Sequence, residues 1–328
     1  MSLFGRKRRG ARTRIFFATD VHGSERCFRK FLNASASYEA DVLILGGDVT
    51  GKLIVPVVEA DGSDGWHAEI FGERVEADSP EALAELQRRI RMMGRYDVVM
   101  SAAQERELAG SDTVVQQTFE RVTHESLARW TALAEERLGD SGVPVYMILG
   151  NDDEPELAEV VRSSPFVTFA EDEICELPGG WELLSFGPST PTPWKTPREL
   201  SEEEIATSLD TLAGKLADAS RAVFNVHCPP ADTHLDQAPL LDDDLRPVVD
   251  ASGVRMTSVG SRSVRAAIER HQPVLGLHGH VHESPGATRL GTTLSINPGS
   301  EYADGIVRGA IVDLEDGHGI RSWQMIQG

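Results

Sequence analysis

The sequence has few cysteines and no long apolar run. Its 328 residues include three cysteines, an odd number without C-x-x-C spacing: Cys27, Cys175 and Cys228. This pattern argues against a disulfide framework and against a thiolate metal site. There is no stretch of about 18 apolar residues and no charged-then-apolar leader. We therefore expect no transmembrane segment and a cytoplasmic location.

Positive charge is scarce outside the first fourteen residues. The net charge is −20, yet residues 1–14 contain six basic residues and no acid, so the rest of the chain carries −26. Such a body should repel long polyanions, so we expect a small substrate and not long nucleic acid. We predict that residues 1–13 form a flexible basic tail and that residues 14–328 form one domain.

Short apolar runs alternate with helical patterns along the chain, which predicts an α/β fold. A helix is expected from about Ser24, with apolar side chains at helical spacing. The predicted strands are Arg14–Asp20, Asp41–Leu45, Pro144–Leu149, Trp181–Phe186, Ala222–Val226, Val274–Leu277, Thr293–Ile296, Val307–Leu314 and Ile320–Met325.

The stretch of about residues 52–142 is too long for a plain crossover between strands. Strand-like runs from Leu53 to Ala77 predict an antiparallel hairpin or meander. The second part looks helical, beginning with Ser79 as a cap and Pro80 in the first turn. We expect an insertion after the second strand that packs against the sheet.

Five of the predicted strands end in Asp, Asn or His next to Gly or Pro. These ends are Asp20-Val21-His22, Gly47-Asp48, Gly150-Asn151, His227 and Gly279-His280-Val281-His282. In open α/β sheets, ligands bind beyond the carboxyl ends of the strands, so the five ends should meet at one site. Taken singly, Asp48 could be a turn former, Asn151 an Asx-turn and His227 a strand cap. No convincing Ser-His-Asp set or P-loop competes with this site.

In this order the motifs resemble the calcineurin-like metallophosphoesterase superfamily, whose signature is D-x-H, G-D, G-N-H, a lone His and G-H-x-H. The match spans residues 20–282, and two further stretches, 47–52 and 297–300, are similar to the Icc-related branch. The resemblance implies a four-layer α/β/β/α sandwich that holds two metal ions. It assigns one ion to Asp20, His22 and His282, the second to Asn151, His227 and His280, and a bridging role to Asp48.

The implied activity is hydrolysis of small phosphodiesters or phosphomonoesters by a metal-bridging hydroxide. All the implied ligand atoms are oxygen or nitrogen, which suits Mn, Fe, Zn or Ni. Two alternatives stay open. One is a nuclease of the same superfamily, and the other is a non-catalytic protein that binds metal or nucleotide.

The chain departs from the signature at Asp152, which stands where the family has a histidine. An ionised Asp152 would repel phosphate and could not donate a proton, whereas a protonated one could do both. We expect it to replace the histidine only in part, so that good leaving groups or diesters are favoured. Candidate substrate contacts are Asn151, Lys52, Trp194 and His234, although Lys52 could be merely solvated and Trp194 part of a rigid connection.

Overall fold

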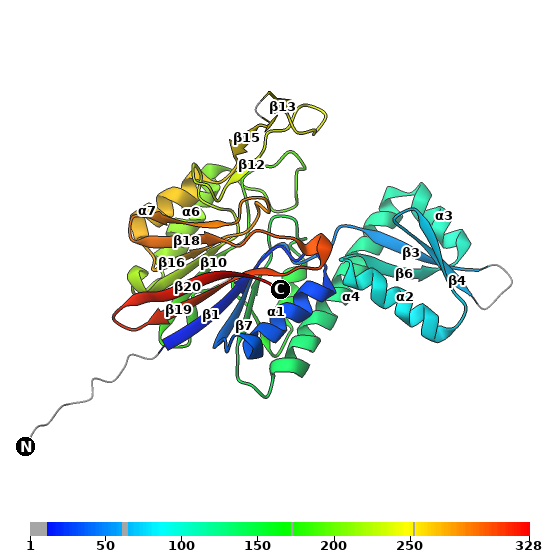
Figure 1. Ribbon diagram of the computed structural model, residues 1–328, viewed down its shortest axis with the longest axis horizontal. Coiled ribbons are helices and arrows are strands. Elements are labelled where there is room, and N and C mark those ends of the chain that lie inside the picture. Colours follow the sequence, from blue (N-terminus) through cyan, green and yellow to red (C-terminus); the bar gives the residue numbers. More distant parts are fainter. Residues whose placement is uncertain (1–11, 61–64, 172, 252) are drawn as a thin grey trace, which may run out of the picture.

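The body of the molecule contains two six-stranded sheets (Figure 1). The computed structural model describes residues 12–60, 65–171, 173–251 and 253–328. The predicted tail therefore lies almost wholly outside the described residues. The first sheet has the order β20 (Gly319–Gln327), β19 (Arg308–Glu315), β1 (Arg12–Ala18), β2 (Val42–Gly46), β7 (Val145–Ile148) and β8 (Val167–Phe169). The second has the order β17 (Gly286–Leu290), β18 (Thr293–Asn297), β16 (Leu275–Leu277), β11 (Ala222–Val226), β10 (Trp181–Phe186) and β9 (Cys175–Leu177).

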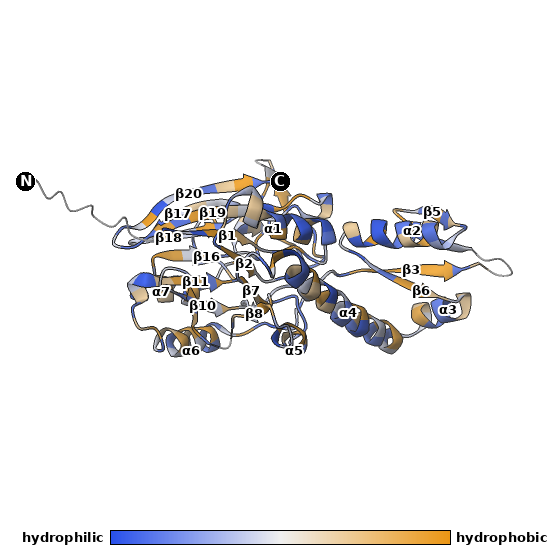
Figure 2. Cartoon of the chain, turned by 90° about the horizontal axis from the view of Figure 1, so that it is seen from below, coloured by the Kyte–Doolittle hydropathy of each residue, from blue (hydrophilic) through white to orange (hydrophobic). Residues whose placement is uncertain are grey.

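Alternate residues of the strands face two different cores. In β1, Phe16 packs toward the helices on the outside, whereas Ile15 and Phe17 pack between the two sheets. The helices over the first sheet are α1 (Glu25–Ser37), α4 (Asp112–Leu138) and α5 (Leu157–Arg162). Those over the second sheet are α6 (Glu202–Ala213) and α7 (Arg262–His271). Figure 2 shows these helices on the outer side of the strands, and the predicted α/β class is confirmed.

Helix α1 begins where the sequence predicted. The Ser24 hydroxyl accepts a hydrogen bond from the backbone N–H of Cys27, which caps the first turn. On the buried face of α1, the Phe28 ring stacks on the Trp130 ring of α4, with centroids 4.3 Å apart. This stacking joins the two helices over the first sheet. None of the helices in the described part of the chain combines the length and apolarity needed to cross a bilayer.

The expected insertion forms a separate four-stranded sheet beside the body (Figure 1). Its order is β5 (Glu73–Ala77), β4 (Trp66–Ile70), β3 (Ile54–Glu59) and β6 (Tyr96–Met100). Helices α2 (Pro80–Met92) and α3 (Ala102–Gly110) flank β6 in sequence. The antiparallel meander β3-β4-β5 and the cap at Ser79 are as predicted.

Strand β6 corrects the sequence interpretation, which treated that region as helical. Tyr96, Val98 and Met100 are buried and alternate with more exposed residues, as a strand requires. The run has only five residues and lies between two helices, so its apolar period could not separate strand from helix. The short strands β12 (Gln237–Pro239), β13 (Val249–Asp250), β14 (Gly253–Val254) and β15 (Met256–Ser258), which form a projecting arm (Figure 1), were likewise not predicted.

Glu202 joins the two helices that cover the second sheet. Its carboxylate, in the first turn of α6, accepts hydrogen bonds from the hydroxyl of Ser261 (2.6 Å) and the backbone N–H groups of Arg262 (2.8 Å) and Ser263 (2.9 Å). These donors form the N-terminus of α7, where a negative charge is favourable. Burial opposes the charge, but these hydrogen bonds outweigh it and lower the pKa of Glu202.

We predict that Glu202→Gln destabilises the fold by about 1 kcal/mol near neutral pH, a value that allows for partial solvent screening. Because the pKa is lowered in the folded state, this contribution is fully present above the unfolded pKa and disappears as the pH falls through the folded pKa. Calorimetric Tm values of both proteins between pH 3.5 and 7 should therefore converge at the acid end. The exposed neighbour Glu203→Gln is the control, and a difference that is constant with pH would contradict the assignment.

Candidate metal centre

The side chains singled out at the strand ends lie together in the structure. Asp20 and His22 follow β1, Asp48 follows β2, Asn151 follows β7, His227 follows β11, and His280 and His282 follow β16. We refer to these seven as the cluster. Its titratable members form two groups that share Asp48, and in each group the candidate ligand atoms lie within 4.8 Å of one another. The first group contains Asp20, His22, Asp48 and His282, and the second contains Asp48, His227 and His280.

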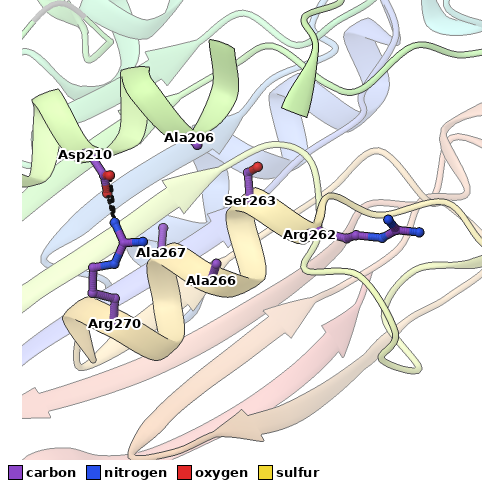
Figure 3. A pocket seen from close by; sticks show the side chains of 7 residues that line it. All are labelled: Ala206, Asp210, Arg262, Ser263, Ala266, Ala267 and Arg270. Carbon is purple, nitrogen blue, oxygen red and sulfur yellow. Dashed lines mark hydrogen bonds and ion pairs between the residues drawn. The ribbon is translucent and has the colours of Figure 1, made fainter. Parts of the chain in front are cut away.

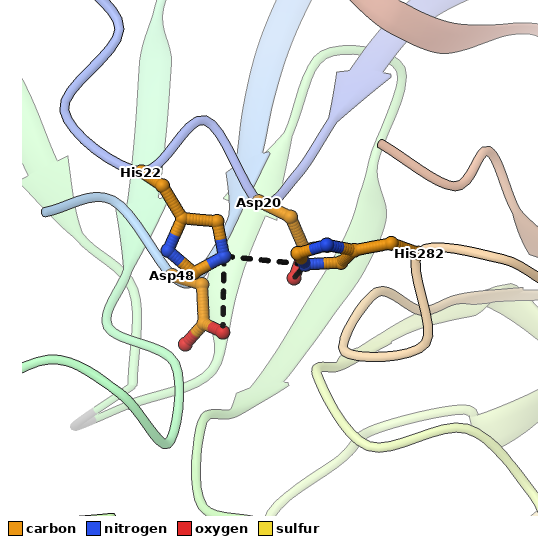
Figure 4. A group of neighbouring side chains, drawn as sticks. All are labelled: Asp20, His22, Asp48 and His282. Carbon is orange, nitrogen blue, oxygen red and sulfur yellow. Dashed lines mark hydrogen bonds and ion pairs between the residues drawn. The ribbon is translucent and has the colours of Figure 1, made fainter. Parts of the chain in front are cut away.

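In the first group, the imidazole of His282 faces both Asp20 and His22 (Figure 4). Its Nε2 is 3.2 Å from Oδ1 of Asp20 and 3.2 Å from Nε2 of His22. Nε2 of His22 is in turn 3.7 Å from Oδ2 of Asp48. Two imidazole nitrogens and two carboxylates therefore converge on one small space.

In the second group, neighbouring polar groups fix the orientation of the side chains. Nδ1 of His227 donates to the carbonyl of Gly46 (2.8 Å), which directs Nε2 toward Oδ1 of Asp48 at 3.3 Å. Nδ2 of Asn151 donates to the hydroxyl of Thr196 (2.9 Å). Oδ1 of Asn151 is thereby left facing Nδ1 of His280, 2.7 Å away.

The backbone of the cluster is strained. Four members have a positive φ, a region that non-glycine residues rarely adopt: Asp20 (52°), His22 (38°), Asp48 (49°) and His280 (67°). Each such residue costs on the order of 1–3 kcal/mol and persists only where the surrounding structure imposes it. Strain of this kind is concentrated at functional sites.

The glycines of the motifs are required by close approach. A Cβ on Gly150 would lie 2.0 Å from Oδ1 of Asp48, and one on Gly279 would lie 2.4 Å from Oδ2 of Asp20. Any side chain at either position would push a carboxylate out of the cluster. Gly150 and Gly279, which precede Asn151 and His280, are thus packing requirements of the site.

The charge of the buried carboxylates is compensated in part by a histidine of the cluster. Asp20 and Asp48 are 1% and 4% exposed, and burial of two carboxylates is costly without cationic partners. Burial also opposes a charge on His227, yet Asp48 and Asp20 outweigh it and raise the pKa of His227 to about 10. Burial lowers the pKa of His22 and of His280 to about 4. Those two imidazoles are therefore neutral at pH 7, the form that binds a metal.

The cluster fits metal ions. Nε2 of His227 is buried 3.3 Å from Oδ1 of Asp48 and forms no hydrogen bond with the described residues. Unpaired buried polar atoms are rare in native proteins and call for a ligand or water. The available atoms are imidazole nitrogens and carboxylate or amide oxygens, a set that suits Mn, Fe, Zn or Ni.

Asp153 supports the cluster although the sequence interpretation gave it no role. Its carboxylate, 0% exposed, accepts hydrogen bonds from the N–H of Val49, from the N–H (2.8 Å) and hydroxyl (2.6 Å) of Thr50, and from the N–H of Gly150 (2.8 Å). It thus joins the loop of Asp48 to the loop of Asn151. Burial and the nearby Asp48 raise the pKa of Asp153 to about 6. In the sequence, the only indication of this role is that Asp153 directly follows Asp152.

Asp152, at the position of the signature histidine, lies at the rim of the cluster. Its backbone N–H donates to Oδ1 of Asp48 (3.0 Å). Its carboxylate forms an ion pair with Lys52 and lies 3.9 Å from Nδ1 of His22. Burial and Asp48 raise the pKa of Asp152, while Lys52 acts against that shift. The sequence suggested Lys52 as a substrate contact. In the structure, its ammonium group is paired with the Asp152 carboxylate.

The remaining candidates differ in their relation to the cluster. The Trp194 side chain is 65% exposed, in the loop whose Thr196 holds Asn151. His234 is exposed beside Gly286 and, within the described ranges, forms no hydrogen bond or ion pair with the cluster. Tyr302, which the sequence interpretation missed, places its ring 4.6 Å from the His22 ring, centroid to centroid.

A surface depression of about 240 Å³ lies between α6 and α7 (Figure 3). It is lined by residues such as Ala206 and Ala267, and the ion pair of Arg270 with Asp210 (2.5 Å) lies at one side. No member of the cluster lines it. It therefore has no part in the metal centre.

Comparison with known proteins supports the fold. No family model matches the sequence. Protein MJ1162 of Methanocaldococcus jannaschii, which is uncharacterized, is 33% identical over 119 residues, covering 35% of this chain and 47% of that protein. The chain thus matches about half the length of this curated relative.

Two crystal structures align over nearly the whole chain. One is TT1561 of Thermus thermophilus, with a TM-score of 0.54 and 13% identity over 97% of this chain and 99% of that one. The other has a TM-score of 0.58 and 17% identity over the same shares. At these identities the similarity is one of fold.

We predict that Asp153→Asn weakens the site without removing a candidate ligand. The side-chain amide of Asn would place its own N–H donors against backbone N–H groups that now donate to the Asp153 carboxylate. We therefore expect a loss of about 2 kcal/mol in the free energy of unfolding. Affinity for Mn²⁺ should fall about 10- to 100-fold, as for other groups that orient metal ligands. Denaturant unfolding and titration calorimetry measure both effects. The control is Glu156→Gln, an exposed side chain without a capping hydrogen bond, and Mn²⁺ affinity equal to wild type in the Asp153 variant would contradict the role.

Proposed function

We propose that this chain, which has the calcineurin-like metallophosphoesterase fold, hydrolyses small phosphoesters with two metal ions bound in the cluster. The observation that carries the proposal is the pair of ligand groups that share Asp48. Asp20, His22 and His282 would hold one ion, Asn151, His227 and His280 the other, and Asp48 both. When bound, two such ions supply an activated water nucleophile and neutralise charge that builds on the phosphoryl oxygens.

The protein's own groups hold this arrangement rigid. The Gly46 carbonyl fixes the ring of His227, and the Thr196 hydroxyl fixes Asn151. Asp20 is oriented by the backbone N–H of His280, which donates to its carboxylate at 3.1 Å. Side chains held in this way need not reorganise during the reaction, which is how an enzyme stabilises a charged transition state.

Lys52 is a cation beside the cluster, paired with Asp152. Its ammonium pairs with Asp152 and its side chain is 54% exposed, so it can also reach solvent or a bound anion. Burial disfavours the charge, but the hydrogen bond to Asp152 outweighs this and raises the pKa of Lys52. A permanent positive charge at the rim suits an anionic phosphoester. The net charge of −20 on the whole chain favours a small ester over a long polyanion.

We predict that Asp48→Asn binds at most one equivalent of metal, whereas the wild-type protein binds two. Loss of the shared carboxylate should reduce kcat on bis(4-nitrophenyl) phosphate by about 10³-fold or more. Metal analysis of the purified proteins and steady-state kinetics with Mn²⁺, Fe²⁺, Zn²⁺ or Ni²⁺ measure the two effects. Asp244→Asn, at an exposed position, is the control.

Two outcomes would decide against the proposal. If Asp48→Asn kept full activity, the two-metal reaction would be excluded. If the metal-loaded wild type bound nucleotides but hydrolysed no mono- or diester, the chain would be a non-catalytic binding protein with this fold.

We further predict that Asp152 is not the proton donor to the leaving group. Burial and Asp48 raise the pKa of its carboxyl group, but the carboxylate is paired with Lys52, which opposes that shift and favours the ionised form. Wild-type kcat/KM should therefore be much higher for aryl than for alkyl esters, and Asp152→Asn should change both by a similar factor. Asp152→His should raise the rate on alkyl esters selectively, by about 10-fold or more. A loss confined to alkyl esters in Asp152→Asn would instead identify Asp152 as the acid.

A further inference from the structure

The turn between β4 and β5 holds an exposed aromatic residue in an unfavourable conformation. Phe71 and Gly72 have φ values of 54° and 78°, as in a two-residue type I′ turn, where Asn, Asp or Gly is preferred. A left-handed conformation costs a residue such as Phe about 1–2 kcal/mol. The Phe71 side chain is 73% exposed, so burial of apolar surface does not offset this cost.

A cation holds the Phe71 ring from one side. The guanidinium carbon of Arg95 lies 4.4 Å from the ring centroid, within the range of a cation–π interaction. Arg95 is itself half-buried, just before β6. The ring is thus fixed by a neighbour and still open to solvent on the rest of its surface.

Strand register places this turn at the end of the insertion that lies next to the metal centre. Strand β4 is antiparallel to β3, with Val57 opposite Ala68, so the turn after β4 lies at the end of the sheet where β3 begins at Ile54. Lys52 is two residues before Ile54.

The same end of the insertion rests on the loops of the cluster. The Tyr96 hydroxyl accepts a hydrogen bond from the N–H of Gly51 (2.7 Å). A Cβ on Gly94 would lie 2.8 Å from the carbonyl oxygen of His22, so the two backbones touch. Arg95 lies between these two contact residues, which ties the Phe71–Arg95 pair to the loops that carry His22 and Asp48.

We propose that Phe71, held by Arg95, is a stacking platform for an aromatic ring of the substrate, such as a nucleobase. Leu53, 55% exposed, is a second exposed apolar residue at the start of the insertion. The inference rests on the proposed function and adds a substrate class to it: phosphoesters that carry a planar ring. Stacking on an aromatic side chain strengthens binding and tolerates different bases, because every base has a π face.

The test compares AMP with ribose 5-phosphate, which differ by the base alone. Titration calorimetry on the Mn²⁺-loaded protein should show that AMP binds about 10-fold more tightly. In Phe71→Asn this preference should disappear while ribose 5-phosphate binds as before. Because Asn suits the left-handed turn, the Tm of Phe71→Asn should equal or exceed that of the wild type. If the protein hydrolyses AMP during the titration, the comparison uses the KM of AMP in place of its dissociation constant.

Controls separate the platform from a general effect of the substitution. Phe71→Tyr should keep the preference for AMP, and Trp323→Asn, at another exposed aromatic residue (42% exposed), should leave it unchanged. A wild type without preference for AMP, or a preference that survives Phe71→Asn, would overturn the platform even if esters are hydrolysed. Conversely, a preference that depends on Phe71 in a protein that hydrolyses no ester would overturn the proposed function and leave the platform standing.

Discussion

Three carboxylates, Asp20, Asp48 and Asp153, are buried at one edge of the molecule, and the rest of the site follows from how their charge is compensated. An ionised carboxylate away from water requires hydrogen-bond donors or cations. Asp153 receives donors from two loops, which compensate its charge only in part, because burial and Asp48 still raise its pKa to about 6. Asp20 and Asp48 face imidazoles, some of whose nitrogens have no partner among the described residues. Their compensation is completed by the cations that we propose to bind there.

The strained loops depend on the sheets behind them. Asp20, His22, Asp48 and His280 have left-handed backbones, a cost that must be offset by burial elsewhere. The strands that precede them are almost wholly buried between the helices and the opposite sheet. Because parallel strands end at a common edge, a rigid body of this kind delivers all seven side chains to one place.

Much of this arrangement could be predicted because it is local in sequence. The cap at Ser24, the strands that precede the cluster and the glycines next to its ligands each leave a short pattern. Features that depend on contacts between residues far apart in the sequence leave no such pattern. Asp153 acts on Val49 and Thr50, 104 and 103 residues earlier, and Tyr302 contacts His22 from near the other end of the chain. Strand β6 exists because β3 is there to pair with it.

The change at Asp152 and the insertion are physically connected. A carboxylate beside Asp48 adds negative charge to an already acidic site and would repel a phosphoester. Lys52 supplies the compensating charge, and Lys52 lies where the chain leaves the body to enter β3. The same end of the insertion carries Leu53 and the exposed ring of Phe71. In the proposed function, the sheets therefore supply the metal ligands, and the insertion supplies both the charge that makes Asp152 tolerable and the surface that a substrate would meet.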